Sequence, residues 1–150
     1  MEAYNKTMAA AALIRDDMDA LLIVKPSYRD GWLLPGGMVE SGESPKRACQ
    51  REIYEEVGLE LSVGRLLCVD YEDKDWRGAE SLKFVFDGGV LAQAQTASVT
   101  LQKDELSDHA FVPTAEAIEK LNYFLSRRVR HALAAQQTGQ TYYLENQKRF

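Results

Sequence analysis

The stretch Gly37–Leu59 reads GMVESGESPKRACQREIYEEVGL, and it predicts a helix with a defined start and a defined end. Ser44 followed by Pro45 is a strong helix start, because the serine hydroxyl can cap the first turn and the proline ring presets φ at the first helical position. Gly58 is a matching stop, since glycine readily takes the left-handed conformation that ends many helices. We therefore expect the helix to lie between these two marks.

Three carboxylates of this helix, Glu52, Glu55 and Glu56, share one face at spacings of three and four residues. Like charges four residues apart cost about 0.2–0.5 kcal/mol per pair. Glu55 and Glu56 also fall in the last turn, where the helix dipole disfavours anions by about 0.3–1 kcal/mol. A bound divalent cation would reverse both penalties, because hard cations take carboxylate and carbonyl oxygens as ligands. A solvated acidic surface is the competing interpretation of these three residues alone.

The composition is that of an ordinary soluble globular protein. With 150 residues, 45% of them hydrophobic, the chain is long enough to bury a core, and we expect a single domain over residues 1–150. The net charge is −5, and basic residues cluster only at Arg127, Arg128 and Arg130, so extended binding of nucleic acid is not expected. A small polyanionic substrate is compatible with this charge if metal ions and a few local bases neutralise it.

The cysteines and the N-terminal segment favour the cytoplasm. Cys49 and Cys68 lie in a predicted helix and a predicted strand, where buried free thiols fit a reducing compartment. The apolar run Met8–Ile14 is too short to span a membrane. It ends in Arg15-Asp16-Asp17 and not in a small-residue cleavage site, so no signal peptide is expected.

Apolar runs and turn residues predict an α/β fold, in which a mixed β-sheet is flanked by helices. Strands are expected at residues 8–14, 20–24, 61–71 (one or two strands), 82–86 and 109–112. Further helices are expected from a Thr114 cap to Leu125 and over residues 127–137, ending near Gly139. Residues 90–101 are ambiguous between strand and loop, and the tail 141–150 packs either on the domain or on a partner.

The spacing of fixed residues in the opening stretch resembles the signature box of the Nudix hydrolase superfamily. Gly37 is followed after five residues by Glu43, and after seven more by the run REIYEEVGL at residues 51–59. The resemblance implies a Nudix-type α/β/α sandwich. It also implies hydrolysis of a nucleoside diphosphate linked to another group, with Mg²⁺ or Mn²⁺ as the cofactor.

The resemblance further implies a metal site built by the box. Glu52, Glu55 and Glu56 would be the metal ligands and catalytic groups, with Glu52 a frequent general base in relatives. The carbonyl of Gly36 would complete the metal site. The chemistry agrees with this mapping, because divalent ions neutralise a diphosphate and lower the pKa of bound water, and a free carboxylate can then take the proton.

By the same resemblance, other residues have supporting roles. Arg51 would orient Glu43 or a helix carboxylate through a charge-assisted pair, and Glu43 and Gly58 would be structural members of the box. In some relatives a downstream acid serves as the base or as an extra metal ligand. Glu105 matches that position best, and Asp104 is the alternative.

Substrate contacts are expected on both sides of the box. Lys25 and Arg29 precede the glycine turn, Pro35-Gly36-Gly37, where related proteins place phosphate-contacting bases, although surface solvation also explains them. Gly37 allows the backbone to approach a ligand closely. Trp76, in a polar loop, is a candidate for stacking on the substrate or for a homodimer contact, whereas Trp32 is expected to pack beside the glycine turn.

The identity of the substrate is left open by the sequence. Relatives that prefer ADP-ribose carry a proline downstream of the box, relatives that cleave dinucleoside polyphosphates carry a tyrosine there, and residues 74–77 (KDWR) contain neither. A nucleoside triphosphate is therefore the default, with ADP-ribose or a nucleotide sugar as alternatives. A non-catalytic nucleotide-sensing module is the competing class of function. An RNA 5′-end pyrophosphohydrolase is disfavoured by the acidic charge.

Overall fold

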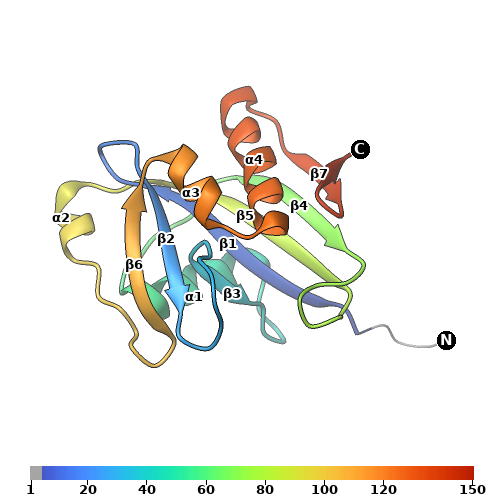
Figure 1. The fold of residues 1–150 in the computed structure, drawn as a ribbon, viewed down its shortest axis with the longest axis horizontal. Helices are drawn as coiled ribbons and strands as arrows, with labels where there is room; N and C mark the ends of the chain where they lie inside the picture. The colour runs from blue at the N-terminus through green and yellow to red at the C-terminus, as the bar shows by residue number, and fades with distance from the viewer. Residues whose placement is uncertain (1–4) are drawn as a thin grey trace.

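The computed structural model describes residues 5–150 of the chain (Figure 1). Its strands are β1 (Thr7–Arg15), β2 (Leu21–Pro26), β3 (Gly36–Met38), β4 (Leu66–Glu72), β5 (Ser81–Val90), β6 (Leu106–Val112), β7 (Tyr142–Glu145) and β8 (Lys148–Arg149). Its helices are α1 (Pro45–Val57), α2 (Gln93–Ala97), α3 (Thr114–Lys120) and α4 (Tyr123–Thr138). Within the described residues, no helix combines the length and the apolar character needed to cross a membrane.

The described strands form one mixed sheet in the order β6-β2-β1-β5-β4-β7-β8, and β3 pairs with β1 at its side. β1 runs parallel to β5, and β4 runs parallel to β7. The other pairs are antiparallel. Parallel neighbours need long connections, and the segments that join these two pairs contain α1 and α4 respectively.

Two apolar cores lie on opposite faces of the sheet, one under α1 and the other under α3 and α4 (Figure 1). Successive side chains of a strand point to opposite faces, and β2 shows this alternation clearly. Leu22 and Val24 belong to the core that α1 covers, whereas Leu21 and Ile23 belong to the core that α3 and α4 cover. The predicted α/β fold, a mixed sheet flanked by helices, is confirmed.

Helix α1 begins and ends at the predicted residues. The hydroxyl of Ser44 accepts a hydrogen bond from the Arg47 amide at 3.2 Å, and Pro45 is the first helical residue. Gly58 has φ of 72°, and its amide donates to the carbonyl of Tyr54 at 2.9 Å. The left-handed conformation of Gly58 therefore ends the helix just after the acidic residues.

The predicted helix from Thr114 to Leu125 is wrong, because two helices occupy this segment. α3 ends at Lys120, and Leu121 is extended with ψ of 151°. Leu121 instead forms a β-bridge with Trp32. Thr114 is the first residue of α3 and not its cap, and its hydroxyl accepts a hydrogen bond from Arg15 Nη1 at 2.9 Å.

Helix α4 begins at Tyr123, before the expected residue 127. The side chain of Asn122 accepts a hydrogen bond from the Leu125 amide at 2.8 Å and caps the new helix. Asparagine favours this position because its short side chain can satisfy an amide that has no partner within the helix. The helix ends at Gly139, where the sequence predicted its end.

The last strands pack on the domain, which decides between the two expectations for residues 141–150. β7 lies against β4, and β8 returns beside β7. The turn between them consists of Asn146 and Gln147, whose φ values are 48° and 62°. Positive φ at both central residues is typical of the tightest β-hairpins. We call residues 142–149 the C-terminal hairpin.

Candidate active site

Two glycines of β3 bring the strand close to both β1 and α1. At Gly36, where φ is 149°, an added Cβ would lie 2.2 Å from the carbonyl oxygen of Ala10. At Gly37, an added Cβ would lie 2.4 Å from Cδ of Glu52. The sequence predicted that these glycines allow the backbone to approach a ligand. The structure adds that Gly37 leaves the space that the Glu52 carboxylate occupies.

Arg51 connects the acidic residues of the box. Its guanidinium donates to both carboxylate oxygens of Glu43, at 2.6 and 2.9 Å. It also donates to Glu52 at 2.9 Å, to Glu55 at 3.1 Å and to the carbonyl of Met38 at 3.0 Å. The hydrogen bonds from Arg51, with one from the Glu40 amide, lower the pKa of Glu43 to about 2. Arg51 thus contacts both partners that the sequence offered it.

Glu56 is the most buried of the three helix acids, with 7% of its surface exposed. Burial, together with the nearby charges of Glu52 and Glu105, raises its pKa to about 8, although a hydrogen bond from the Gly36 amide opposes the rise. That hydrogen bond joins Gly36 N to Glu56 Oε1 at 2.7 Å. Gly36, whose carbonyl was expected to complete a metal site, therefore also holds Glu56 through its amide.

The other acids surround Glu56 at different depths. Glu52 is partly buried, and burial raises its pKa while Arg51 opposes the rise. Glu55 is exposed at the outer side of α1. Glu105 is exposed in the loop before β6, yet its charge raises the pKa of both Glu52 and Glu56. Glu105 therefore lies close enough to interact electrostatically with Glu52 and Glu56, and its role as a base or a metal ligand stays a prediction.

The donor set fits a hard divalent cation in kind. Glu52 and Glu56 are desolvated carboxylates that repel each other, and a cation would relieve that repulsion. Within residues 5–150, however, no three acidic, histidine or cysteine side chains are arranged as a preformed metal cage. Arg51 and the Gly36 amide occupy carboxylate oxygens. Metal binding therefore requires the carboxylates to exchange some of these hydrogen bonds for the ion.

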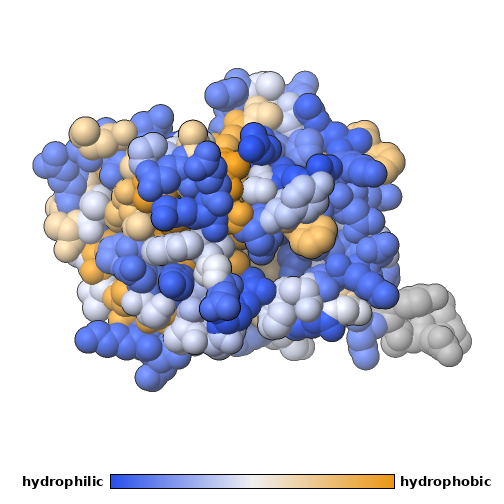
Figure 2. Space-filling view, in the orientation of Figure 1, coloured by the Kyte–Doolittle hydropathy of each residue, from blue (hydrophilic) through white to orange (hydrophobic). Residues whose placement is uncertain are grey.

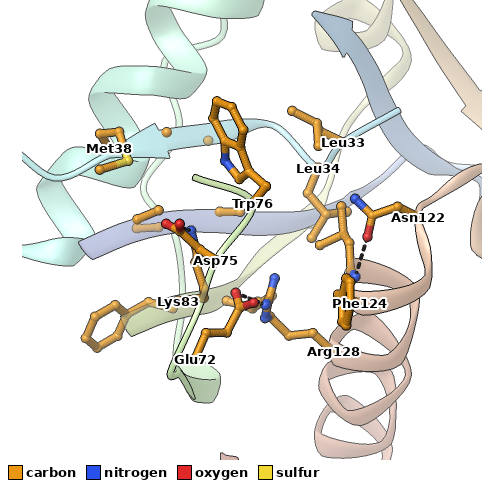
Figure 3. Close-up of a pocket in the computed structure, with 18 of the residues that line it drawn as sticks. Leu33, Leu34, Met38, Glu72, Asp75, Trp76, Lys83, Asn122, Phe124 and Arg128 are labelled. Carbon is orange, nitrogen blue, oxygen red and sulfur yellow. Dashed lines mark hydrogen bonds and ion pairs between the residues drawn. The ribbon is translucent and has the colours of Figure 1, made fainter. Parts of the chain in front are cut away.

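A cavity of about 450 Å³ opens beside the glycine turn, and its lining includes Gly36, Gly37 and Met38 but none of the three helix acids (Figure 3). Trp76 stands on one wall, and Asn122 and Phe124 at the start of α4 stand across from it (Figure 3). Figure 2 shows apolar residues gathered near the middle of the face that carries α3 and α4, with hydrophilic residues around them. The cavity wall combines both kinds and includes Arg29, Leu33, Leu34, Gly36, Gly37, Met38, Glu72, Lys74, Asp75, Arg77, Lys83, Leu125 and Arg128.

The residues predicted to contact substrate fall into two groups. Arg29, Gly37 and Trp76 line the cavity, and the Arg29 guanidinium lies 4.6 Å from the centre of the Trp76 ring. Lys25 is exposed on β2 and is not part of the cavity wall. Trp32 packs against the core beside α3 and α4, as predicted.

The cavity wall that comes from β4 and α4 was not predicted from the sequence. Arg128 is one residue of the basic cluster noted in the sequence, yet only 6% of it is exposed and its Nη2 group donates to Glu72. A signal for this site was available, because Asp70 and Glu72 are alternate residues of an otherwise apolar strand. Buried acids in such a strand need a buried cation, and the arginines of α4 were the candidates.

A sandwich with an acidic helix, a glycine turn and an adjoining cavity is the arrangement expected of the Nudix class. The chain belongs to this family, since residues 5–133 match the NUDIX domain. Among curated relatives, it is 40% identical to diphosphoinositol polyphosphate phosphohydrolase 2 of Rattus norvegicus over a segment of 75 residues. This segment makes up 49% of this chain and 41% of the relative. A mouse diphosphoinositol polyphosphate phosphohydrolase 3-alpha is 39% identical over a segment that covers 46% of that protein. The matched segments thus span less than half the length of these relatives.

Solved structures agree on the fold. The crystal structure of a MutT protein from Methanosarcina mazei Go1 superposes with a TM-score of 0.74 at 22% identity, covering 93% of this chain and all of that one. The crystal structure of a UDP-X diphosphatase has a TM-score of 0.75 at 27% identity, covering 96% of this chain and 69% of that one.

Cys49 and Cys68 are both buried free thiols, as the sequence predicted.

Proposed function

We propose that this protein hydrolyses a diphosphate linkage in a nucleoside diphosphate-X compound, such as a nucleoside triphosphate, with Mg²⁺ or Mn²⁺ as the cofactor. The observation that carries the proposal is the pair Glu52 and Glu56, two desolvated carboxylates held against a glycine turn that borders the cavity. Membership of the NUDIX family supports the reaction class. The named activities of the relatives, phosphohydrolase and diphosphatase, support cleavage at phosphorus.

Glu52, Glu55 and Glu56 would hold the metal ion, with the Gly36 carbonyl as a further ligand. When bound, the ion would supply charge neutralisation at the diphosphate and Lewis acidity at phosphorus. The raised pKa of Glu56 means that this carboxyl is largely protonated near neutral pH without a cation. Metal binding is therefore expected to release a proton from this site.

Glu52 is the proposed general base, which takes the proton of the attacking water. Arg51 donates to Glu52 Oε1 at 2.9 Å, so it orients this carboxylate while leaving its second oxygen available. Glu105 is the alternative base, because its charge faces the same group from the loop before β6. Either carboxylate would act from a position that the chain itself fixes.

The cavity favours a nucleotide over an inositol polyphosphate as the substrate. A ring that bears many phosphates needs several unpaired cations around it. Here Arg77 and Lys83 form ion pairs with Asp75, at 2.7 and 3.7 Å, and Arg128 pairs with Glu72. These bases are already neutralised by carboxylates of the same wall.

The remaining features of the wall suit a planar base and a diphosphate. Trp76 and Phe124 offer aromatic surfaces for stacking. Arg29 and Lys74 are the cavity bases that form no ion pair among the described residues, and they can contact phosphate oxygens. Lys25, outside the cavity wall, would act only at the approach to the site.

A nucleoside diphosphate sugar is a second candidate, because the UDP-X diphosphatase fold covers 96% of this chain. ADP-ribose belongs to the same class of substrate. A nucleotide-sensing module without catalysis is the competing function, and we propose homodimer formation and a cytoplasmic location as expectations that accompany the enzyme.

A hydrolysis screen with Mg²⁺ tests the proposal. The panel contains nucleoside triphosphates, nucleotide sugars, ADP-ribose, dinucleoside polyphosphates and a diphosphoinositol polyphosphate, with Glu52→Gln and Glu56→Gln as matched variants. We expect turnover of at least one nucleotide and a loss of about 10²-fold or more in each variant. Binding of a nucleotide without turnover would favour the sensor, and turnover that survives both substitutions would overturn the catalytic assignment.

A further inference from the structure

Asp70 of β4 is completely buried and receives hydrogen bonds from two distant parts of the chain. Arg128 Nε donates to its Oδ2 oxygen at 2.9 Å. The side-chain amide of Gln147 donates to the same Oδ2 oxygen at 3.1 Å, and the Gln147 backbone amide donates to Oδ1 at 3.0 Å. Asp70 Oδ2, which accepts the hydrogen bond from Arg128, is therefore also held by a residue of the C-terminal hairpin.

The same arginine reaches the cavity. Its Nη2 group donates to Glu72 Oε1, and both side chains line the cavity wall (Figure 3). Among the described residues, neither Arg128 Nη1 nor the second oxygen of Glu72 has a hydrogen-bond partner. Arg128 thus connects a buried anchor at Asp70 with a donor and an acceptor that remain available in the wall.

The C-terminal hairpin is itself held firmly at this point. The Asn146 amide donates to the carbonyl of Tyr71 at 2.7 Å, and the Asn146 side chain accepts from the Asp73 amide at 3.1 Å. A ring nitrogen of His131 in α4 lies 3.0 Å from the carbonyl oxygen of Gln147. The turn is therefore tied both to β4 and to α4, and only 3% of Gln147 is exposed.

We propose that Gln147 is a positioning residue for the substrate cavity, which it controls through Asp70 and Arg128. This inference rests on the proposed function, since it takes the cavity as the site that binds the nucleotide. The hairpin lies outside the region that matches the NUDIX domain, residues 5–133. The position of Arg128 in the cavity thus depends on a segment outside the residues that match the family model.

The physical reason is the scarcity of donors around a buried carboxylate. If Gln147 loses its side-chain amide, Asp70 Oδ2 keeps Arg128 as its only side-chain donor among these contacts. A buried carboxylate without enough donors is strongly disfavoured, so the guanidinium is drawn toward Asp70 and away from Glu72. The donor and acceptor that face the cavity then change their relative position.

Gln147→Met tests the proposal, because methionine keeps most of the side-chain volume and removes the amide. We expect KM for the nucleotide found in the screen to rise about tenfold, the effect of weakening one charge-assisted hydrogen bond, while kcat changes less than about twofold. Gln147→Glu, which places a second carboxylate against Asp70, should raise KM at least as much.

Two substitutions serve as controls, one just before the C-terminal hairpin and one within it. Thr141→Val removes the hydrogen bond from Thr141 Oγ1 to the carbonyl of Leu66, at 2.7 Å, and leaves Asp70 untouched. Tyr143→Phe removes only the hydrogen bond from its hydroxyl to Glu145. We expect KM to stay unchanged in both, even where Tm falls. If Thr141→Val raised KM as much as Gln147→Met at an equal loss of Tm, or if Gln147→Met left KM unchanged, the proposal would be overturned.

A second readout separates this proposal from the proposed function. In a ¹H–¹⁵N spectrum, the Nε–H group of Arg128 reports its hydrogen bond to Asp70, and its signal is identified by its loss in Arg128→Lys. We expect this signal to shift in Gln147→Met and to stay in place in Tyr143→Phe. If no nucleotide is hydrolysed, the proposed function fails, and the spectrum alone decides. An unshifted Arg128 signal in Gln147→Met would then overturn the positioning role.

Discussion

Glu56 makes stability depend on pH in the metal-free protein. The pKa of this carboxyl rises from 4.5 to about 8 on folding, mainly through burial. Between these values the folded protein keeps a proton that the unfolded chain has lost, so the free energy of unfolding falls as pH rises through this window. The effect is on the order of a few kcal/mol, since one unit of pKa corresponds to about 1.36 kcal/mol.

We therefore expect Glu56→Gln to raise Tm at the upper end of this window and to make the dependence of Tm on pH shallower. Glutamine can still accept the hydrogen bond from Gly36. Glu52 and Glu72, whose pKa values are also raised chiefly by burial, act in the same direction and leave a residual slope. Glu43 acts only at lower pH, because its pKa of about 2 lies below the window. An unchanged slope in Glu56→Gln, measured by thermal unfolding without metal, would contradict this account.

The two glycines of β3 should respond differently to alanine. In Gly37→Ala the new methyl overlaps the side chain of Glu52, which can rotate away, so we expect a small change in Tm and a loss of activity of about 10²-fold. In Gly36→Ala the methyl overlaps the backbone of Ala10, which cannot give way, and we expect a destabilisation of about 1–3 kcal/mol or more. Thermal unfolding and single-turnover hydrolysis on both variants test this contrast, and equal losses of Tm would refute it.

Helix α1 depends on Arg51 as its link to the preceding loop. Arg51→Lys keeps the charge but cannot make the two parallel hydrogen bonds to Glu43 together with those to Glu52 and Glu55. We expect kcat to fall about 10–100-fold, the usual effect of losing a group that orients a catalytic carboxylate. Arg47→Lys on the same helix is the control, because the Arg47 side chain forms no hydrogen bond or ion pair among the described residues, and it should leave kcat unchanged.

At the scale of elements, the sequence predicted best where one local signal decides the structure. The serine, proline and glycine around α1 act within a few residues of themselves, and the helix follows them. The break between α3 and α4 depends instead on Leu121, which bridges to Trp32, a residue far away in the chain. Asn122 was a usable capping signal, but the apolar spacing around it concealed the two-residue interruption.

In the site, too, contacts between residues close in sequence were easier to predict than contacts between distant residues. The Arg51–Glu43 pair was predictable because both residues lie in one short motif. The pair of Glu72 and Arg128 was harder to predict, since the acids of β4 indicate a buried cationic partner but that partner lies 56 positions away in the chain. Its charges are acceptable only because they pair when the sheet and α4 meet. The roles assigned to the helix carboxylates, to Glu105 and to Lys25 stay predictions.

For the whole molecule, Mg²⁺ should stabilise the fold against heat. At a free concentration about 100 times Kd, a ligand that binds only the folded state adds about 2.7 kcal/mol, which corresponds to an increase in Tm of roughly 5–10 °C for a chain of this size. The increase should be smaller in Glu52→Gln and in Glu56→Gln. A Tm that is independent of Mg²⁺ would favour a merely solvated acidic surface on α1.

The pairing of Asp70 with Gln147 also bears on how the protein is made. The two residues are 77 positions apart, and β4 leaves the ribosome long before its parallel neighbour β7. At a synthesis rate of about 5–20 residues per second, Gln147 is made roughly 4–15 s after Asp70. During this interval one edge of the sheet has no neighbouring strand. Slow translation over this interval would prolong the exposure of that edge, so the nascent chain should depend on chaperones most strongly between the synthesis of β4 and that of the C-terminal hairpin.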